Sequence, residues 1–140
     1  MIRKNLTNAV AAAAIKCGYS FFCGDAKRIS RELNAVPAAW LTPIEAVGVS
    51  GVMQGEITYK VTLKLIEIDR HLDEQGKQEM ICKMEQHAMS IYRELCQNID
   101  VKSVSDLKWS PMEYVYTAQG EISLNISMLV STVFCEQHFN

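Results

Sequence analysis

Residues 57–69 read ITYKVTLKLIEID, and apolar and polar side chains alternate along them. A period of two is typical of a β-strand with one buried and one solvated face. The alternation holds through Leu65 and then fails, because Ile66 and Ile68 place apolar groups on the other face. We therefore expect a long strand in which either a bulge resets the phase or both faces are covered near its end.

A second alternating stretch reads GEISLNISMLVSTVF and covers residues 120–134. Gly120 supplies the turn between this stretch and the apolar alternation of residues 112–116, so the pattern predicts a hairpin. Its second strand, which extends to about Cys135, would be much longer than the usual five or six residues.

Two helices are expected around these strands. Residues 2–17 carry apolar side chains at steps of three and four together with a run of alanines, and Gly18 ends the pattern. Residues 77–98 form the main amphipathic helix, because their apolar side chains recur at helical spacing. This apolar stripe comprises Met80, Met84, Ala88, Ile91 and Leu95.

The segment between the first helix and the long strand has a less regular pattern. Residues 19–23 are compatible with a short strand, and Asp25 with the cap of a short helix that Pro37 terminates. Residues 38–52 are expected to form a strand after an irregular start.

These elements predict a single α+β domain over residues 1–140. Its antiparallel sheet has about four strands with long hairpins and packs against the N-terminal helix and the main amphipathic helix. A chain of 140 residues buries enough surface to fold without disulfides or a metal. The expected core includes Val61, Leu63, Ile91, Leu95, Leu124 and Ile126.

The composition excludes several classes of protein. The 14 basic and 16 acidic residues are spread without blocks, whereas nucleic-acid and membrane-surface binding need concentrated positive charge. The five cysteines form no C-x-x-C pair and are expected as buried thiols in a reducing compartment. No run approaches the ~20 apolar residues of a membrane span, and Lys16 before Cys17 argues against a lipoprotein signal. We expect a soluble protein made in the cytosol.

Motifs for catalysis or cofactor binding are absent from the sequence, including the glycine spacing of phosphate-binding loops. Asp69, His71 and Asp73 form D-x-H-x-D, which could hold a divalent ion on an extended strand, but a solvated turn is the favoured interpretation. Cys82 and His87 point in different directions on a helix. We expect no enzymatic activity, metal or cofactor.

Two lysines and two threonines line the polar face of the long strand, namely Lys60, Lys64, Thr58 and Thr62. They could face phosphates or an acidic partner. The solvated face of a half-buried sheet is the favoured interpretation.

The first helix is followed by a long strand, the main helix and a second long strand. The residues that carry this order are ITYKVTLKLIEID (57–69), MEQHAMSIYRELCQNI (84–99) and GEISLNISMLVSTVF (120–134). This order resembles that of the tail-completion and tail-terminator proteins of long-tailed bacteriophages and of related neck proteins, with residues 18–35 outside the pattern. The resemblance implies a non-enzymatic subunit that forms a ring, commonly a hexamer, at the head-proximal end of the tail. Such a ring ends tail-tube growth and contacts the tail tube and the head connector of the virion. It is made and assembled in the cytoplasm of the bacterial host.

The ends of both long strands are expected to contact neighbouring subunits. They place apolar residues on both faces, and residues 122–135 contain neither a charge nor a proline, which soluble proteins use to blunt an exposed edge. The two tryptophans lie beside prolines and are equally compatible with interface anchors and with caps on the core. The candidate interface residues are Ile66, Ile68, Leu129, Val133, Phe134, Trp40 and Trp109.

Two other functions are compatible with the sequence. A small-molecule-binding or enzymatic α+β domain would have a pocket between sheet and helices, lined by Tyr59, Tyr114 and Tyr116. A protein-binding adaptor would act as a monomer or dimer.

Overall fold

Two long antiparallel strands, β4 (Gln54–Ile68) and β6 (Glu121–Cys135), form the centre of the sheet. They pair without a break from Gln54, opposite Cys135, to Ile68, opposite Glu121. Because this register contains no bulge, side chains alternate between the two faces along the whole length of both strands.

The structure is a computed structural model that describes residues 2–68, 73–114, 116–117 and 120–135, with the backbone alone at Tyr114. These residues form a six-stranded sheet in the order β1-β2-β4-β6-β5, and β3 pairs with β4 beyond the end of β2. The flanking strands are β1 (Ser20–Cys23), β2 (Ala38–Leu41), β3 (Glu45–Gly51) and β5 (Val101–Tyr114).

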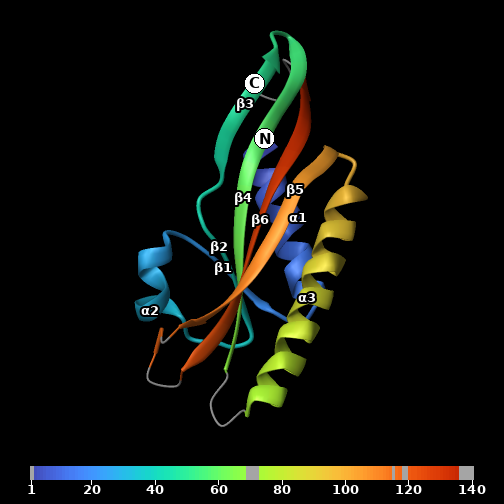
Figure 1. Cartoon of the computed structure of the whole chain (residues 1–140). Helices are drawn as coiled ribbons and strands as arrows, with labels where there is room; N and C mark the ends of the chain where they lie inside the picture. The colour runs from blue at the N-terminus through green and yellow to red at the C-terminus, as the bar shows by residue number, and fades with distance from the viewer. Residues whose placement is uncertain (1, 69–72, 115, 118–119, 136–140) are drawn as a thin grey trace.

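The two expected helices cover one face of the sheet, which we call the helix-covered face (Figure 1). Helix α1 (Ile2–Lys16) ends before Gly18, whose φ of +95° closes the turn into β1. Helix α3 (Glu74–Cys96) begins three residues earlier than expected, because the Asp73 carboxylate accepts a hydrogen bond from the Gly76 N–H at 2.7 Å. None of the helices formed by the described residues is long and apolar enough to cross a lipid bilayer.

The α+β class and both helices are confirmed, but the sheet differs from the expected one. It has six strands instead of about four, and it is mixed because β1 and β2 are parallel. Parallel neighbours need a crossover, which the helical turn η1 (Ala26–Arg28) and helix α2 (Ile29–Glu32) provide. The expected strand over residues 38–52 is divided into β2 and β3 around Pro43.

The main hydrophobic core lies between the helix-covered face and helices α1 and α3. All six residues expected in the core are buried, as is most of the α3 stripe. On the β-strands the buried residues alternate, so that Leu63 faces Ile126 and Leu65 faces Leu124 across the central pair. The period of two therefore predicted the inward face of both long strands correctly.

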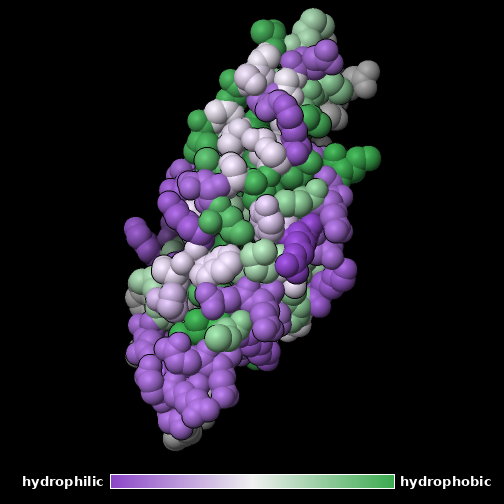
Figure 2. Space-filling view, turned by 45° about the vertical axis from the view of Figure 1, so that its right-hand side comes forward, coloured by the Kyte–Doolittle hydropathy of each residue, from purple (hydrophilic) through white to green (hydrophobic). Residues whose placement is uncertain are grey.

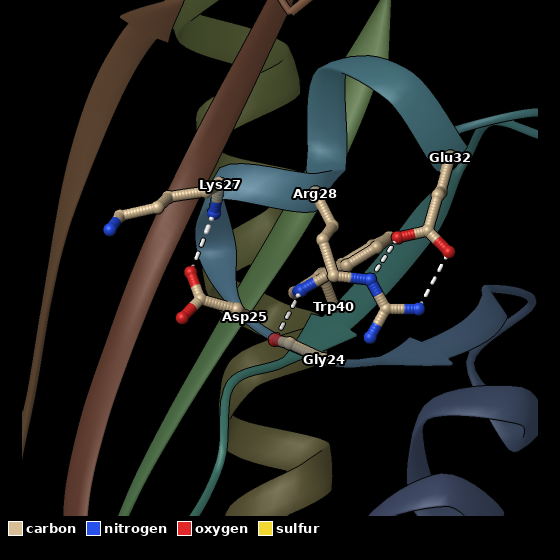
Figure 3. Close-up of polar contacts among 6 residues, drawn as sticks. All are labelled: Gly24, Asp25, Lys27, Arg28, Glu32 and Trp40. Carbon is tan, nitrogen blue, oxygen red and sulfur yellow. Dashed lines mark hydrogen bonds and ion pairs between the residues drawn. The ribbon is translucent and has the colours of Figure 1, made fainter.

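A second, smaller core lies on the opposite face, beneath η1 and α2. It consists of Ile29, Ala38, Trp40 and Ile66. The Trp40 indole N–H donates a hydrogen bond to the Gly24 carbonyl oxygen at 2.8 Å, and the Arg28–Glu32 ion pair spans the short helix nearby (Figure 3). Both faces of β4 are thus covered near Ile66. Of the two explanations for the broken alternation, cover on both faces is correct and a bulge is wrong.

Truncation of the main core tests this assignment of faces. Leu63→Ala and Leu124→Ala should each lower the free energy of unfolding by about 2–5 kcal/mol, because each leaves a cavity between sheet and helices. Lys60→Ala, on the exposed side of the same strand, is the control and should change it by less than about 0.5 kcal/mol. Thermal and denaturant unfolding followed by circular dichroism measures these changes, and unchanged melting of both leucine variants would contradict the assignment.

Candidate assembly surfaces

The hairpin formed by β3 and the first part of β4 projects beyond both covering helices (Figure 1). We call residues 45–57 the arm. Every residue of β3 is exposed, so this strand contributes nothing to either hydrophobic core. A strand of this kind is held by its pairing with β4 alone, and its side chains are free to contact another molecule.

The turn of the arm requires glycine at two positions. Gly51 has a φ of +91°, which L side chains rarely adopt. A Cβ at Gly51 would collide with the Gln54 carbonyl oxygen, and one at Gly55 with that of Ser50. The close approach of the two strands therefore fixes the shape of the tip.

Large apolar side chains are exposed around the arm. Val49 is 65% exposed and Val52 is 92% exposed, while Val133 of β6 flanks the arm because it pairs with Glu56. Hydrophobic residues gather toward this end of the molecule, whereas the opposite end is hydrophilic on the same view (Figure 2). The arm patch, as we call it, consists of Val47, Val49, Val52, Met53 and Val133. Val49 pairs with Ile57 and Val133 pairs with Glu56, so these two valines lie on opposite faces of the sheet, and the arm patch surrounds the end of the hairpin.

The two outer edges of the sheet differ in how they are protected. The long edge strand β5 carries lysines, acidic residues, a proline and two register shifts, which hinder pairing with another strand. In β3 the only charged residue is Glu45, and residues 46–55 contain no charge and no proline. The outer edge of β3 is therefore open to contact by another chain.

The structure separates the predicted interface residues into two groups. Val133 is 43% exposed, and Leu129, Ile68 and Trp109 are half-buried, so these four keep some accessible surface. The other three predicted residues, Trp40, Ile66 and Phe134, are buried in the cores of their own chain.

These three side chains are covered within their own chain, and the structure shows by what. The crossover from β1 to β2 covers Trp40 and Ile66, which are at most 1% exposed. Phe134 pairs with Gly55 and faces the helix-covered side, where it belongs to the main core. Trp109 is also tied to its own chain, since its indole N–H donates to the Glu85 carboxylate of α3 at 2.7 Å.

Other sequence candidates do not converge on a chemical site. Tyr59 lies in the main core and Tyr116 packs against the second core, so these two tyrosines do not line a common pocket. At Tyr114 the structure describes the backbone alone. Cys82 is exposed on α3, and His87 is bonded to another residue. Asp69 and His71 lie outside the described residues, where the D-x-H-x-D hypothesis stays open, and Asp73 caps α3.

A polar contact joins α1 to α3 at the edge of the core. The buried Tyr19 side chain, just after α1, places its hydroxyl 2.8 Å from His87 Nδ1. Burial and the neighbouring Lys83 ammonium lower the pKa of His87, so the ring is neutral at pH 7. Burial, in turn, raises the pKa of the Tyr19 hydroxyl. The pair fastens the two covering helices to each other.

The sequence reasoning missed most of the arm patch. It read residues 38–52 as a strand and did not identify Val47, Val49, Val52 and Met53 as exposed. The available signal was the uncharged run AVGVSGVMQG at residues 46–55, in which three glycines lack side chains that could pack.

Comparison of the sequence with protein families found no match, and comparison with characterised proteins found none either. The functional argument therefore depends on the surfaces of the molecule and on the order of its elements.

The Tyr19–His87 contact should make stability depend on pH. The folded state holds His87 neutral with a lowered pKa, whereas the unfolded chain has the ordinary value near 6.5. Between that value and the lowered pKa the unfolded state binds more protons, so stability falls as the pH decreases from about 6.5 toward the lowered pKa. Tyr19→Phe should cost about 0.5–1.5 kcal/mol at pH 8 through the lost hydrogen bond.

His87→Gln is the matched variant for the pH dependence, measured by urea unfolding between pH 5 and 8. Burial raises the pKa of half-buried Glu67, so its contribution to the pH dependence of stability has the opposite sign. Wild type and His87→Gln share this contribution, so it cancels in their comparison. The difference in free energy of unfolding between wild type and His87→Gln should therefore become smaller as the pH falls. A difference that is independent of pH would contradict the role of His87.

Proposed function

We propose that this protein is a non-enzymatic assembly protein of a bacteriophage virion, which forms a ring at the head–tail junction. In this proposal the ring ends growth of the tail tube and joins the tail to the head connector. The protein would be made and assembled in the cytoplasm of the bacterial host. The single observation that carries the proposal is the arm patch on a hairpin that projects from the body of the subunit.

The exposed apolar residues of the arm patch require a binding partner that shields them from water. Val47 and Val49 are in contact with water along β3, which has no charged residue after Glu45, and Val52 is exposed in the turn that follows. An uncharged, apolar edge strand left exposed would promote uncontrolled aggregation, which natural proteins avoid. A defined neighbour that covers the arm turns this liability into a specific contact.

The position of the arm bears on the symmetry of that contact. The arm belongs to the β3 side of the sheet, and the opposite edge is formed by β5. If the arm of one copy contacts a different surface of the next copy, the contact is heterologous and repeats around a ring or along a filament. A closed ring is the outcome that also agrees with the resemblance in element order.

Two residues of β6 that were predicted to contact neighbouring subunits lie beside the arm or close to it. Val133 pairs with Glu56 close to the tip of the arm, and half-buried Leu129 lies on the same face of β6, opposite Lys60. Both lie on the face of the sheet away from α1 and α3, beside the β4 strand of the arm. In this proposal they contact the same neighbour as the arm.

Introduction of a charge into the arm patch tests the proposal. Val49→Lys and Val133→Lys should shift the protein from ring to monomer, since a lysine ammonium in a buried contact loses its hydration. The unfolding midpoint should change little, because both side chains are exposed in the subunit. Light scattering coupled to size-exclusion chromatography gives the mass, and negative-stain microscopy the ring.

Ile15→Lys is the matched control, because Ile15 is also an exposed apolar residue but lies near the end of α1 away from the arm. It should leave the ring intact. A wild-type protein that stays monomeric up to millimolar concentration, or rings that survive both arm substitutions, would contradict the proposal.

A further inference from the structure

The sheet face opposite α1 and α3 carries an ordered set of polar side chains that the proposed assembly does not use. In the register of the three long strands, Thr62 pairs with Ser127, which pairs with Lys108. The next row on the same face runs from Lys64 through Asn125 to Ser110. We call these six residues the polar grid.

The polar grid borders a shallow hollow of about 240 Å³. Its lining includes Thr62, Ser127, Lys108, Ser110 and Asn125, which come from three different strands. Hydroxyl groups, the Asn125 amide and the Lys108 side chain thus border one depression, while Lys64 lies outside its lining and reaches it through Asn125. None of the six grid residues is acidic. Among the ion pairs of the described residues, one involves a grid residue: the Lys108 ammonium lies 4.0 Å from the Asp106 carboxylate, and both side chains are exposed.

Lys64 is the most unusual member of the polar grid. Its side chain is half-buried beside Trp40, and its ammonium donates a hydrogen bond to Asn125 Oδ1 at 3.3 Å. Among the ion pairs of the described residues, none includes Lys64. Burial lowers the pKa of this ammonium. A cation that has lost part of its hydration without gaining a carboxylate is stabilised by any anion that reaches it.

The spacing of the two ammonium groups suits an anion held between them. Lys64 and Lys108 are two strands and two residues apart, which is about 10 Å across the sheet and about 7 Å along it. Both side chains are long enough to lean over the central strand, where the hydroxyl of Ser127 and the amide of Asn125 lie.

We propose that the polar grid is a binding site for a phosphate group, either inorganic phosphate or the phosphate of a small monoester. A phosphate offers three or four acceptor oxygens, enough for two ammonium groups and several hydroxyls, whereas a carboxylate offers two. The two lysine ammonium groups of the grid attract an anion, although the exposed Asp106 carboxylate lies 4.0 Å from the ammonium of Lys108. This inference does not depend on the formation of a ring.

Phosphorus-31 NMR tests the proposal on the protein in whatever assembly it forms. Inorganic phosphate and glycerol phosphate are titrated in turn at pH 7.5 and constant ionic strength, with chloride as the balancing anion. The wild-type protein should broaden the resonance in a saturable manner, and excess acetate should not reverse the broadening. Stronger binding of glycerol phosphate than of inorganic phosphate would identify the monoester as the better ligand.

Three lysine variants distinguish a built site from general attraction to positive charge. Lys64→Met and Lys108→Met should each weaken binding about tenfold or more, since each removes a charge-assisted hydrogen bond. Lys60→Met removes an exposed lysine from the same strand and face as Lys64, and should change affinity less than about twofold. Thermal melting verifies that the variants are folded.

The proposal is overturned by any of three results. The first is that wild-type protein does not broaden the phosphorus resonance in a saturable manner. The second is that Lys60→Met weakens phosphate binding as much as Lys64→Met does. The third is that acetate, at the same concentration as phosphate, displaces the bound phosphate. Lys64→Met replaces the ammonium by an apolar chain of similar length in a half-buried position, so the variant is expected to remain folded.

Discussion

The uninterrupted pairing of β4 with β6 is the constraint on which the rest of the structure depends. Because the ladder runs from Gln54 opposite Cys135 to Ile68 opposite Glu121 without a bulge, every side chain on both strands has a fixed face. A slip by one residue would move Leu63 and Leu124 to the solvent and the polar grid into the core. The main core, the open polar face and the position of the arm all follow from this one register.

The same ladder explains which parts of the fold could be predicted from the sequence. Alternation over residues 57–65 and 122–130 indicated the correct inward faces, and helical spacing identified α1 and α3 within a few residues. These elements have one buried face over many residues, so their periodicity is visible in the sequence. The α+β class could therefore be predicted from the amino-acid pattern alone.

Elements without such periodicity could not be predicted. Strand β5 was recognised only near residues 112–116, because register shifts at residues 101–103 and 105–108 reset its alternation, and Asp106 has a positive φ. The crossover through η1 and α2 is too short to show a period, so the sequence left open whether the chain itself or a neighbouring subunit covers Trp40 and Ile66. Strand β3 is exposed along its length, which removes the contrast between faces that a pattern needs.

Two surfaces of different character result from this architecture. At one end the arm patch is apolar and lies on an unprotected edge, as expected of a contact between protein subunits. On the open face the polar grid borders a shallow hollow and carries lysines and hydroxyls, as expected of a site for a small anion. The two surfaces are separable by mutation because they share no residue, although β6 contributes to both.

The most direct test of the central claim, that the arm mediates assembly, is hydrogen exchange measured by mass spectrometry on the peptide that covers residues 45–54. In an isolated subunit the β3 amides that face away from β4 have no partner in the sheet and should exchange rapidly. The account predicts that these amides become protected when the concentration is raised from nanomolar to the range in which rings form. Arm amides that exchange equally fast at both concentrations, while rings are present, would contradict it.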